Sequence, residues 1–225
     1  MFNLPFCSSV AYAVPGNPSS NNTSISNATS LGLVYDHYAS FAWTNFTYSL
    51  AQVACDTTSS AQYSLVRTCT DCANAYKEWL CAVVIPRCED FSNSSSFLQP
   101  RAIAQPFINE TYGKNFVDDP TLSSENQTKT YFNSSRNPMI DSVIKPGPYK
   151  EVLPCEDICY ELVRSCPSFL GFGCPLPGHG LNYSYGKPPT CNSARTGISG
   201  ASMSKVLGPL TFIMVFCSTL AVIAT

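Results

Sequence analysis

The chain has 225 residues, of which only 12% are charged, and its formal net charge is −2. Soluble domains carry about 25% charged residues, and nucleic-acid binding needs a basic surface, so this composition argues against a nucleic-acid partner. Twelve cysteines favour an oxidising compartment in which disulfides persist, whereas two histidines, His37 and His179, are too few for a His-rich metal site.

The amino-terminal part is predicted to contain a loop and then a long helix. No basic start or apolar run precedes Cys7, so we expect that the chain is a fragment or that its gene model begins too late. Residues 15–30 are rich in Pro, Asn, Ser and Thr and predict a loop. An amphipathic helix is predicted over 32–54, with one apolar stripe at helical spacing: Tyr35, Tyr38, Ala42, Phe46, Leu50 and Val53.

Two further helices are predicted from the same periodicity. The first covers 70–84, ends before Pro86 and has one apolar face: Cys72, Tyr76, Trp79, Leu80 and Val83. The second begins at Pro154, taken as a proline in the first helical position, and runs to Cys166, with an inner face of Cys155, Ile158, Cys159, Leu162 and Cys166. The segment after Cys174 is rich in Pro, Gly and Tyr and is predicted to be irregular.

A stretch of 66 residues without cysteine, 89–154, separates these two helices. It is rich in Ser, Asn and Pro, and a loop of this length in a compact domain is usually functional or disordered. We therefore predict one extracellular cysteine-rich domain over 1–192, in which 89–154 is a long glycosylated insertion. The predicted fold class is mainly α and disulfide-rich.

The carboxyl-terminal end predicts attachment to a membrane. Residues 193–205 form a polar spacer, and 206–225 are 20 residues without charge, long enough to cross a hydrocarbon layer of about 30 Å. Small residues upstream are typical of a lipid-anchor signal that is removed in maturation, and the attachment candidates are Asn192, Ser193, Gly197 and Ser199. A permanent single span is the alternative. Both interpretations place the folded part outside the cell.

Nine Asn-x-Ser/Thr sequons predict N-glycosylation and passage through the secretory pathway. The alternative is that loops rich in Ser and Asn create such sequons incidentally. Two of them are neighbours and are not expected to carry glycans together. The sequon asparagines are Asn21, Asn22, Asn27, Asn45, Asn93, Asn109, Asn126, Asn133 and Asn182.

The cysteine spacing resembles that of the Frizzled-type cysteine-rich domain. The resemblance lies in Cys81-Ala-Val-Val-Ile-Pro-Arg-Cys88, in the Cys-x3-Cys-x6-Cys pattern that follows Pro154, and in an early segment around Cys7. It implies the bridges Cys7–Cys81, Cys72–Cys166, Cys155–Cys191 and Cys159–Cys174, with the extra Cys55 and Cys69 paired to each other. It leaves Cys88 unpaired, because the first cysteine of the pattern would lie upstream of Met1. Sequence alone does not determine the connectivity.

A closer resemblance covers nearly the whole chain. The chain is similar to the fungal stretch-activated calcium-channel component of the Mid family in the segments Leu4-Pro-Phe-Cys-Ser-Ser-Val-Ala-Tyr-Ala-Val-Pro-Gly-Asn-Pro18, Cys69-Thr-Asp-Cys-Ala-Asn-Ala-Tyr-Lys-Glu-Trp-Leu-Cys81, Ile85-Pro-Arg-Cys88 and Leu153-Pro-Cys-Glu-Asp-Ile-Cys159. The resemblance implies a glycosylated subunit on the extracellular face of the plasma membrane. It also implies a large pore-forming channel subunit as the partner, with which calcium is admitted under mechanical stress or mating signals.

The expected function is therefore that of an auxiliary or regulatory channel subunit that docks on the extracellular side of the pore. An apolar stretch without ionisable residues supplies no filter oxygens or charged ring for a pore of its own. The alternative is a lipid-anchored surface receptor or ligand-binding module, which needs an exposed apolar groove. The channel interpretation instead needs a glycan-free face and an ordered stretch within 89–154.

Acidic residues are the candidates for binding calcium. The densest groups are Asp118 with Asp119, and the set Glu151, Glu156, Asp157 and Glu161. Neither group has the spacing of an EF-hand loop, so solvated faces are the preferred interpretation. Motifs of nucleophilic, metal-dependent or phosphate-binding catalysis do not occur, and we predict that the chain is no enzyme and needs no cofactor.

A lipid anchor predicts that phosphatidylinositol-specific phospholipase releases the full-length protein from membranes. The measurement is the share of protein in the supernatant after treatment. Retention in the membrane fraction would favour the permanent span.

Overall fold

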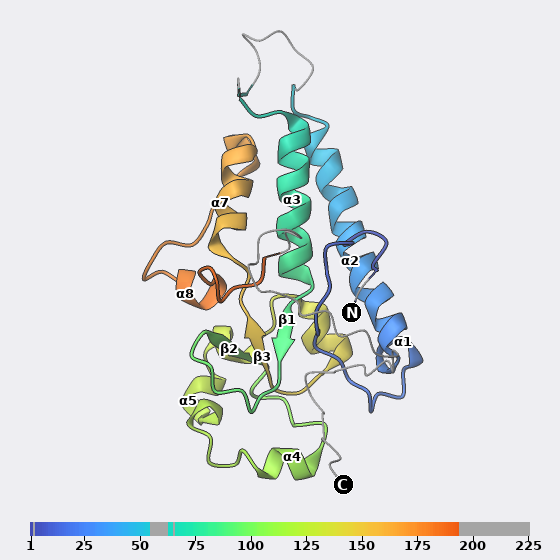
Figure 1. Ribbon diagram of the computed structural model, residues 1–225, viewed down its shortest axis with the longest axis vertical. Helices are drawn as coiled ribbons and strands as arrows, with labels where there is room; N and C mark the ends of the chain where they lie inside the picture. The colour runs from blue at the N-terminus through green and yellow to red at the C-terminus, as the bar shows by residue number, and fades with distance from the viewer. Residues whose placement is uncertain (2, 55–62, 65, 194–225) are drawn as a thin grey trace, which may run out of the picture.

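The computed structural model describes residues 1, 3–54, 63–64 and 66–193. Three longer helices run side by side, with α3 (Cys69–Val84) between α2 (Ala28–Leu50) and α7 (Glu156–Ser165) (Figure 1). A small sheet and several short helices lie below them in this view. The chain is therefore disulfide-rich and partly helical, and it also contains a sheet that the hydrophobic pattern did not predict.

The loop predicted over 15–30 is wrong in its second half. A short helix, α1 (Thr23–Ser26), precedes α2, and each begins at an asparagine whose side chain accepts hydrogen bonds from the first turn. The Asn22 Oδ1 lies 2.9 Å from the Ser24 backbone nitrogen, and the Asn27 Oδ1 lies 2.9 Å from that of Thr29. Asparagine is a favoured helix N-cap, so the residues taken as loop formers are helix starts.

The starts of the other two long helices are also determined by nearby residues. α3 begins with a capping box, in which the Asp71 backbone N–H donates to the Thr68 hydroxyl and the Thr68 N–H donates to the Asp71 carboxylate. The prediction that Pro154 occupies the first turn of the third helix is wrong. Cys155 is the N-cap of α7, and Pro154 instead pairs with Asn192 in a short parallel bridge.

The insertion over 89–154 is ordered along its length. Its elements are β2 (Leu98–Arg101), α4 (Glu110–Lys114), the 3₁₀ helix η1 (Pro120–Leu122), α5 (Ser124–Gln127), α6 (Thr130–Asn133), the π-helical turn η2 (Ile140–Ile144) and β3 (Tyr149–Val152). After α7 follow the 3₁₀ helix η3 (Ser168–Leu170) and α8 (Leu181–Ser184). The disorder that we allowed for this insertion is therefore not observed.

The sheet holds the insertion against the helical part. Its central strand is β3, which pairs antiparallel with β1 (Arg87–Glu89) on one side and with β2 on the other. In this register Glu151 lies opposite Cys88 and opposite Gln99. The strands have three or four residues each, too short to show an alternating pattern, which is why the sequence did not predict them.

The main core lies where the amino-terminal segment, α2, α3, η2 and β3 meet. Tyr35, Leu31 and Tyr149 are almost completely buried in it. A smaller cluster, built on Phe46, Cys72, Leu162 and Cys166, joins α2, α3 and α7. The prediction of a buried stripe on α2 is therefore confirmed for Tyr35 and Phe46.

Four disulfides join segments that are distant in the chain: Cys7–Cys81, Cys72–Cys166, Cys155–Cys191 and Cys159–Cys174. They are the same four pairs that the Frizzled resemblance implies. Cys88 is also disulfide-bonded, so the expectation that it lacks a partner is wrong. Cys69 is disulfide-bonded as well, and Cys55, its expected partner, lies outside the described residues.

We predict that the double variant Cys72→Ser/Cys166→Ser loses surface expression, because α3 and α7 lose their cross-link. The bridge spans 94 residues, against 15 for Cys159–Cys174. Since the entropic contribution grows with the logarithm of loop length, its loss costs about 1.6 kcal/mol more than loss of the shorter bridge. The measurements are surface level and the midpoint of chemical unfolding, with Cys159→Ser/Cys174→Ser as the matched control. Normal trafficking and an unchanged midpoint would contradict this role.

Candidate docking surface

A second apolar face of α2 is exposed to solvent. Leu33 is 53% exposed and Phe41 is 63% exposed. An open groove of about 670 Å³, which we call the α2 groove, is lined by these two side chains together with Ser24, Ser30, Val34, His37, Tyr38 and Met139. Large apolar side chains that gather on one exposed face mark an interaction surface more often than scattered ones do.

This surface arises because α2 carries apolar side chains on two sides. Leu31, Tyr35 and Ala39 are spaced by four residues and face the core. Leu33 and Phe41 each follow a core-facing residue, Leu31 and Ala39, by two positions. Two residues turn a helix by about 200°, so these side chains face outward. The prediction that Tyr38 belongs to the buried stripe is wrong, since it is 36% exposed and lines the groove.

The backbone behind the groove is held firmly by a buried carboxylate. Asp36 accepts hydrogen bonds from the backbone nitrogens of Cys7, at 2.7 Å, and Phe6, at 2.9 Å. Cys7 is in turn bridged to Cys81 of α3. On the same side the Tyr35 hydroxyl donates to the Pro15 carbonyl at 2.9 Å. α2 is therefore tied to both the amino-terminal segment and α3.

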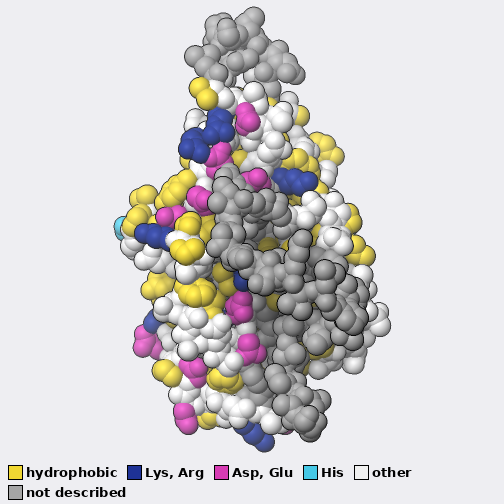
Figure 2. Space-filling view, viewed as in Figure 1, with side chains coloured by type: hydrophobic (Ala, Val, Ile, Leu, Met, Phe, Trp, Pro, Cys, Tyr) yellow, Lys and Arg dark blue, Asp and Glu magenta, His cyan; other side chains and the backbone are white. Residues whose placement is uncertain are grey.

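Charge contributes little to the α2 groove. Its lining contains His37, and Lys, Arg, Asp and Glu do not occur among the lining residues. On the face shown in Figure 2, basic side chains group near the upper left, next to acidic ones, and further charged side chains of both signs lie along the molecule. The lining of the α2 groove is therefore apolar or polar without Lys, Arg, Asp or Glu.

The sheet contains a buried ionic centre that sets the position of the insertion. Glu151 of β3 is completely buried, and its Oε2 accepts from the Arg101 Nε at 2.6 Å. Its Oε1 accepts from the Nε of Arg136, in the segment before η2. The carboxylate is thus held between two guanidinium groups, which we call the Glu151 centre.

The two arginines use their other donors on backbone carbonyls of α8 and α6. Arg101 donates to Tyr183 at 2.9 Å and to Tyr131 at 2.7 Å, while Arg136 donates to Ser184. Burial alone raises the pKa of the Glu151 carboxyl, but the positive charges of Arg136 and Arg101 outweigh this and hold its pKa below the ordinary value. The insertion and the carboxyl-terminal segment are therefore joined by charge-assisted hydrogen bonds.

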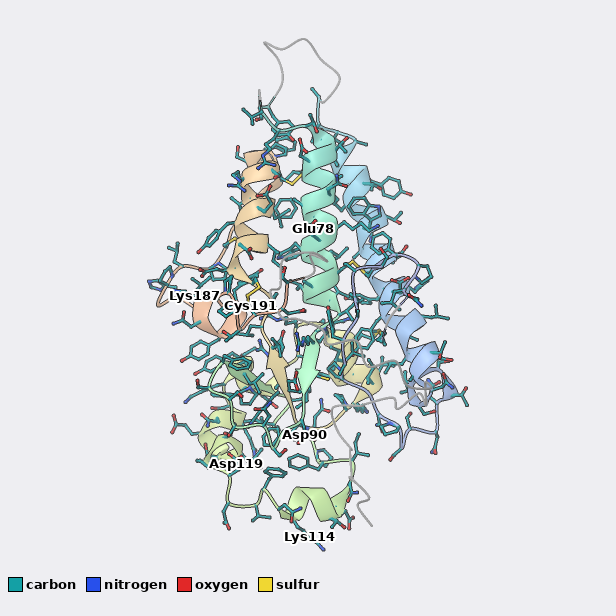
Figure 3. The ribbon with its side chains drawn as sticks, in the orientation of Figure 1. Glu78, Asp90, Lys114, Asp119, Lys187 and Cys191 are labelled. Atoms are coloured by element: carbon teal, nitrogen blue, oxygen red, sulfur yellow. A yellow bond between two sulfur atoms is a disulfide. The ribbon has the colours of Figure 1, made fainter. Side chains whose placement is uncertain are left out.

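The acidic residues considered for calcium do not come together. Glu151 is engaged with arginines, and Glu161 of α7 pairs with Arg67 at 2.9 Å. Asp119 lies in the lower half, where it accepts from the Thr121 nitrogen and caps η1 (Figure 3). Within the described ranges, groups of three or more His, Cys, Asp or Glu that suit a metal do not occur.

Comparison with known proteins gives the family. The model of the Mid1 family, described as a stretch-activated Ca²⁺-permeable channel component, matches residues 1–199. The chain belongs to the Mid1 family. It is 44% identical over 199 residues to the stretch-activated cation channel yam8 of Schizosaccharomyces pombe and 38% identical over 176 residues to the stretch-activated cation channel MID1 of Saccharomyces cerevisiae.

These matches cover 86% and 78% of this chain but only 34% and 26% of the two relatives. The Mid1-family chain therefore spans about a third or less of the curated proteins that it resembles. No solved structure matches it. Among the described residues, no helix combines the length and apolar character of a membrane span, and residues 206–225 lie outside that part of the chain.

The sequons of this Mid1-family chain differ in their surroundings. Asn45 and Asn182 are exposed on helices. Asn22 and Asn27 use Oδ1 as caps, which leaves Nδ2, the atom that a glycan is joined to, for modification. The Asn126 Nδ2 instead donates to the carbonyls of the short helix η1 and is half-buried, so a glycan there would break these bonds. The remaining sequons are exposed at Asn21 and Asn109 and half-buried at Asn93 and Asn133.

One lipid-attachment candidate is placed unfavourably. Asn192 is 2% exposed, its N–H donates to the Leu153 carbonyl at 2.7 Å, and its carbonyl accepts from the Cys155 N–H. It also directly follows Cys191, which is bridged to Cys155. Attachment at Asn192 would disturb this bridge, whereas Ser193 is exposed. Gly197 and Ser199 lie outside the described residues.

We predict that Glu151→Gln destabilises the purified protein by about 3–5 kcal/mol, because it leaves two buried guanidiniums without a counter-charge. The folded pKa of Glu151 is below the ordinary 4.5, so its contribution is complete above pH 4.5 and is lost as the pH falls through the lower folded value. The wild type should therefore lose more stability than the variant between pH 7 and about pH 3.

The measurement is the free energy of chemical unfolding at the two pH values. Glu89→Gln is the control, since Glu89 is a neighbouring strand residue whose side chain is 36% exposed and lies 3.5 Å from Arg87. This control should change stability by less than about 1 kcal/mol. Equal losses in the two variants would rule out the Glu151 centre as a support of the fold.

Proposed function

We propose that this chain is an auxiliary or regulatory part of a stretch-activated Ca²⁺-permeable channel and that it docks through the α2 groove on the extracellular side of a pore-forming subunit. The observation that carries the proposal is the groove itself, an apolar surface that remains exposed in the folded chain. Membership of the Mid1 family supports the association with a channel.

The composition of the groove suits a protein partner. Aromatic side chains are enriched at the centres of protein interfaces, and Tyr38 and Phe41 are exposed side by side in the groove. None of the sequon asparagines is part of the lining, but Asn27 lies between the lining residues Ser24 and Ser30, so a glycan on Asn27 would start beside the groove. The aromatic composition therefore supports a protein partner, and docking there requires that the sequon at Asn27 is unoccupied or that its glycan points away from the groove.

The structure also offers a route by which load on the groove reaches the rest of the chain. A partner seated on α2 would load α3 through Cys7–Cys81, and α3 is linked to α7 through Cys72–Cys166. Covalent bridges hold these helices together where noncovalent packing alone would yield first. The proposed role is therefore that of a stiff extracellular cap on the channel.

The cellular setting belongs to the same proposal. We infer that the chain passes through the secretory pathway, carries glycans at exposed sequons, and lies on the extracellular face of the plasma membrane. The apolar segment 206–225 would attach it there as a span or as a lipid-anchor signal. The four disulfide pairs support a Frizzled-type frame for the domain.

A second candidate is a surface receptor or ligand-binding module, and the same groove favours it. A volume of about 670 Å³ is within the range of sites that hold small apolar ligands. The two candidates differ in what the groove contacts, a channel subunit or a free ligand. They are separated by whether groove variants lose the channel subunit on purification.

We predict that Phe41→Asp in the full-length protein weakens co-purification of the pore-forming subunit by at least about tenfold and lowers stretch-induced calcium uptake, because a charge replaces a central aromatic anchor. Tyr48→Asp is the matched control, since Tyr48 is on the same helix, 68% exposed and outside the groove lining. Folding is checked by surface level. Unchanged co-purification with Phe41→Asp would exclude docking through the groove.

A further inference from the structure

A second hollow borders α2 near its carboxyl end. This pocket has a volume of about 300 Å³ and lies between α2, α3 and the segment that follows α7. Its walls include Phe46, Tyr76, Leu170 and Phe172, and its rim includes Asn45 and Ser49. We call it the aromatic pocket.

The walls of the aromatic pocket include three aromatic rings that pack against one another. Phe46 and Tyr76 stack with ring centroids 3.7 Å apart and an angle of 15° between their planes. Phe172 lies 6.0 Å from Phe46 and 5.7 Å from Tyr76, tilted against both. Because the three rings come from α2, α3 and the segment after α7, anything that fills the pocket contacts all three.

The rim carries a modification signal. Asn45 is exposed and begins the sequon Asn45-Phe46-Thr47, so the residue that would bear the glycan is next to a wall of the pocket. Ser49 follows one helical turn later and is also exposed, which places its hydroxyl on the same side of α2. The α2 groove, by contrast, has no sequon asparagine in its lining.

The first sugar of an N-linked glycan matches this pocket chemically. One face of a pyranose presents C–H groups with partial positive charge, which are attracted to the negative face of an aromatic ring. Its hydroxyl and acetamido groups can exchange hydrogen bonds with a serine hydroxyl. Because the sugar is joined directly to the Asn45 side chain, its effective concentration at the pocket is high, and a weak contact suffices to seat it.

We propose that the glycan on Asn45 seats its first N-acetylglucosamine in the aromatic pocket and thereby ties α2, α3 and the segment after α7 together. The chain's own sugar is thus the ligand of the pocket. This inference rests on the secretory passage in the proposed function, but not on the partnership with a channel.

The experiment uses the full-length glycoprotein and compares two trimming enzymes. An endoglycosidase leaves the first N-acetylglucosamine on each asparagine, whereas a peptide N-glycosidase hydrolyses the side-chain amide, releases the whole glycan and leaves an aspartate, a charge change from which Asn45→Gln is free. Hydrogen exchange is measured in peptides that cover 42–50 and 72–79. Exchange should stay unchanged after the first enzyme and become about fivefold faster after the second, as expected for a modest loss of local stability.

Three variants make the result specific. Asn45→Gln should reproduce the faster exchange in these peptides, whereas Asn109→Gln, at an exposed sequon in the insertion, should not. In a Phe172→Ala background, removal of the sugar should have no further effect, because the pocket has lost a wall. This double-mutant cycle separates sugar docking from a general effect of glycans.

Three outcomes would overturn the inference. They are an unmodified Asn45 by mass spectrometry, equal effects of the two enzymes, and unchanged exchange in Asn45→Gln. Co-purification of the channel subunit is recorded in the same variants. If Asn45→Gln co-purifies the channel subunit normally and its hydrogen exchange is unchanged, sugar docking is wrong while the proposed function stands. Docking through the α2 groove is tested separately by Phe41→Asp.

Discussion

The buried Glu151 carboxylate, held between Arg101 and Arg136, joins the two halves of the molecule. It lies on the central strand of a sheet whose strands are too short to be stable alone, and its arginines reach the carbonyls of α8. Burial of three charges is costly. It is tolerated here because the guanidinium groups of Arg101 and Arg136 donate to the Glu151 carboxylate and to backbone carbonyls of α6 and α8. The insertion over 89–154, rich in Ser, Asn and Pro, is therefore ordered.

In the part of the molecule built from α2, α3 and α7, disulfides hold the segments together. Each of the four bridges joins a helix or its cap to a distant segment, so the small helical core does not depend on apolar burial alone. The two devices are sensitive to different conditions: reduction breaks the disulfides, and acid weakens the Glu151 centre.

α2 contributes to three different parts of the structure. One side packs in the core, a second forms the α2 groove, and its carboxyl end borders the aromatic pocket. The two hollows differ in one decisive respect, since a sequon asparagine lies on the rim of the aromatic pocket and none lies in the groove. We therefore propose a sugar as the ligand of the aromatic pocket and a protein as the partner of the groove.

The sequence by itself determined the three long helices to within a few residues and the family, because helical periodicity and motif runs are local signals; the four disulfide pairs followed only from the resemblance to the Frizzled-type domain. It did not reveal the sheet, the order of the insertion or the Glu151 centre, since Arg101, Arg136 and Glu151 are isolated in the chain and acquire meaning only when three segments meet. The outward face of α2 was present in the spacing of Leu33 and Phe41, but which of its two apolar faces is buried depends on what packs against it. That choice is made by tertiary contacts, through Asp36 and the bridge at Cys7.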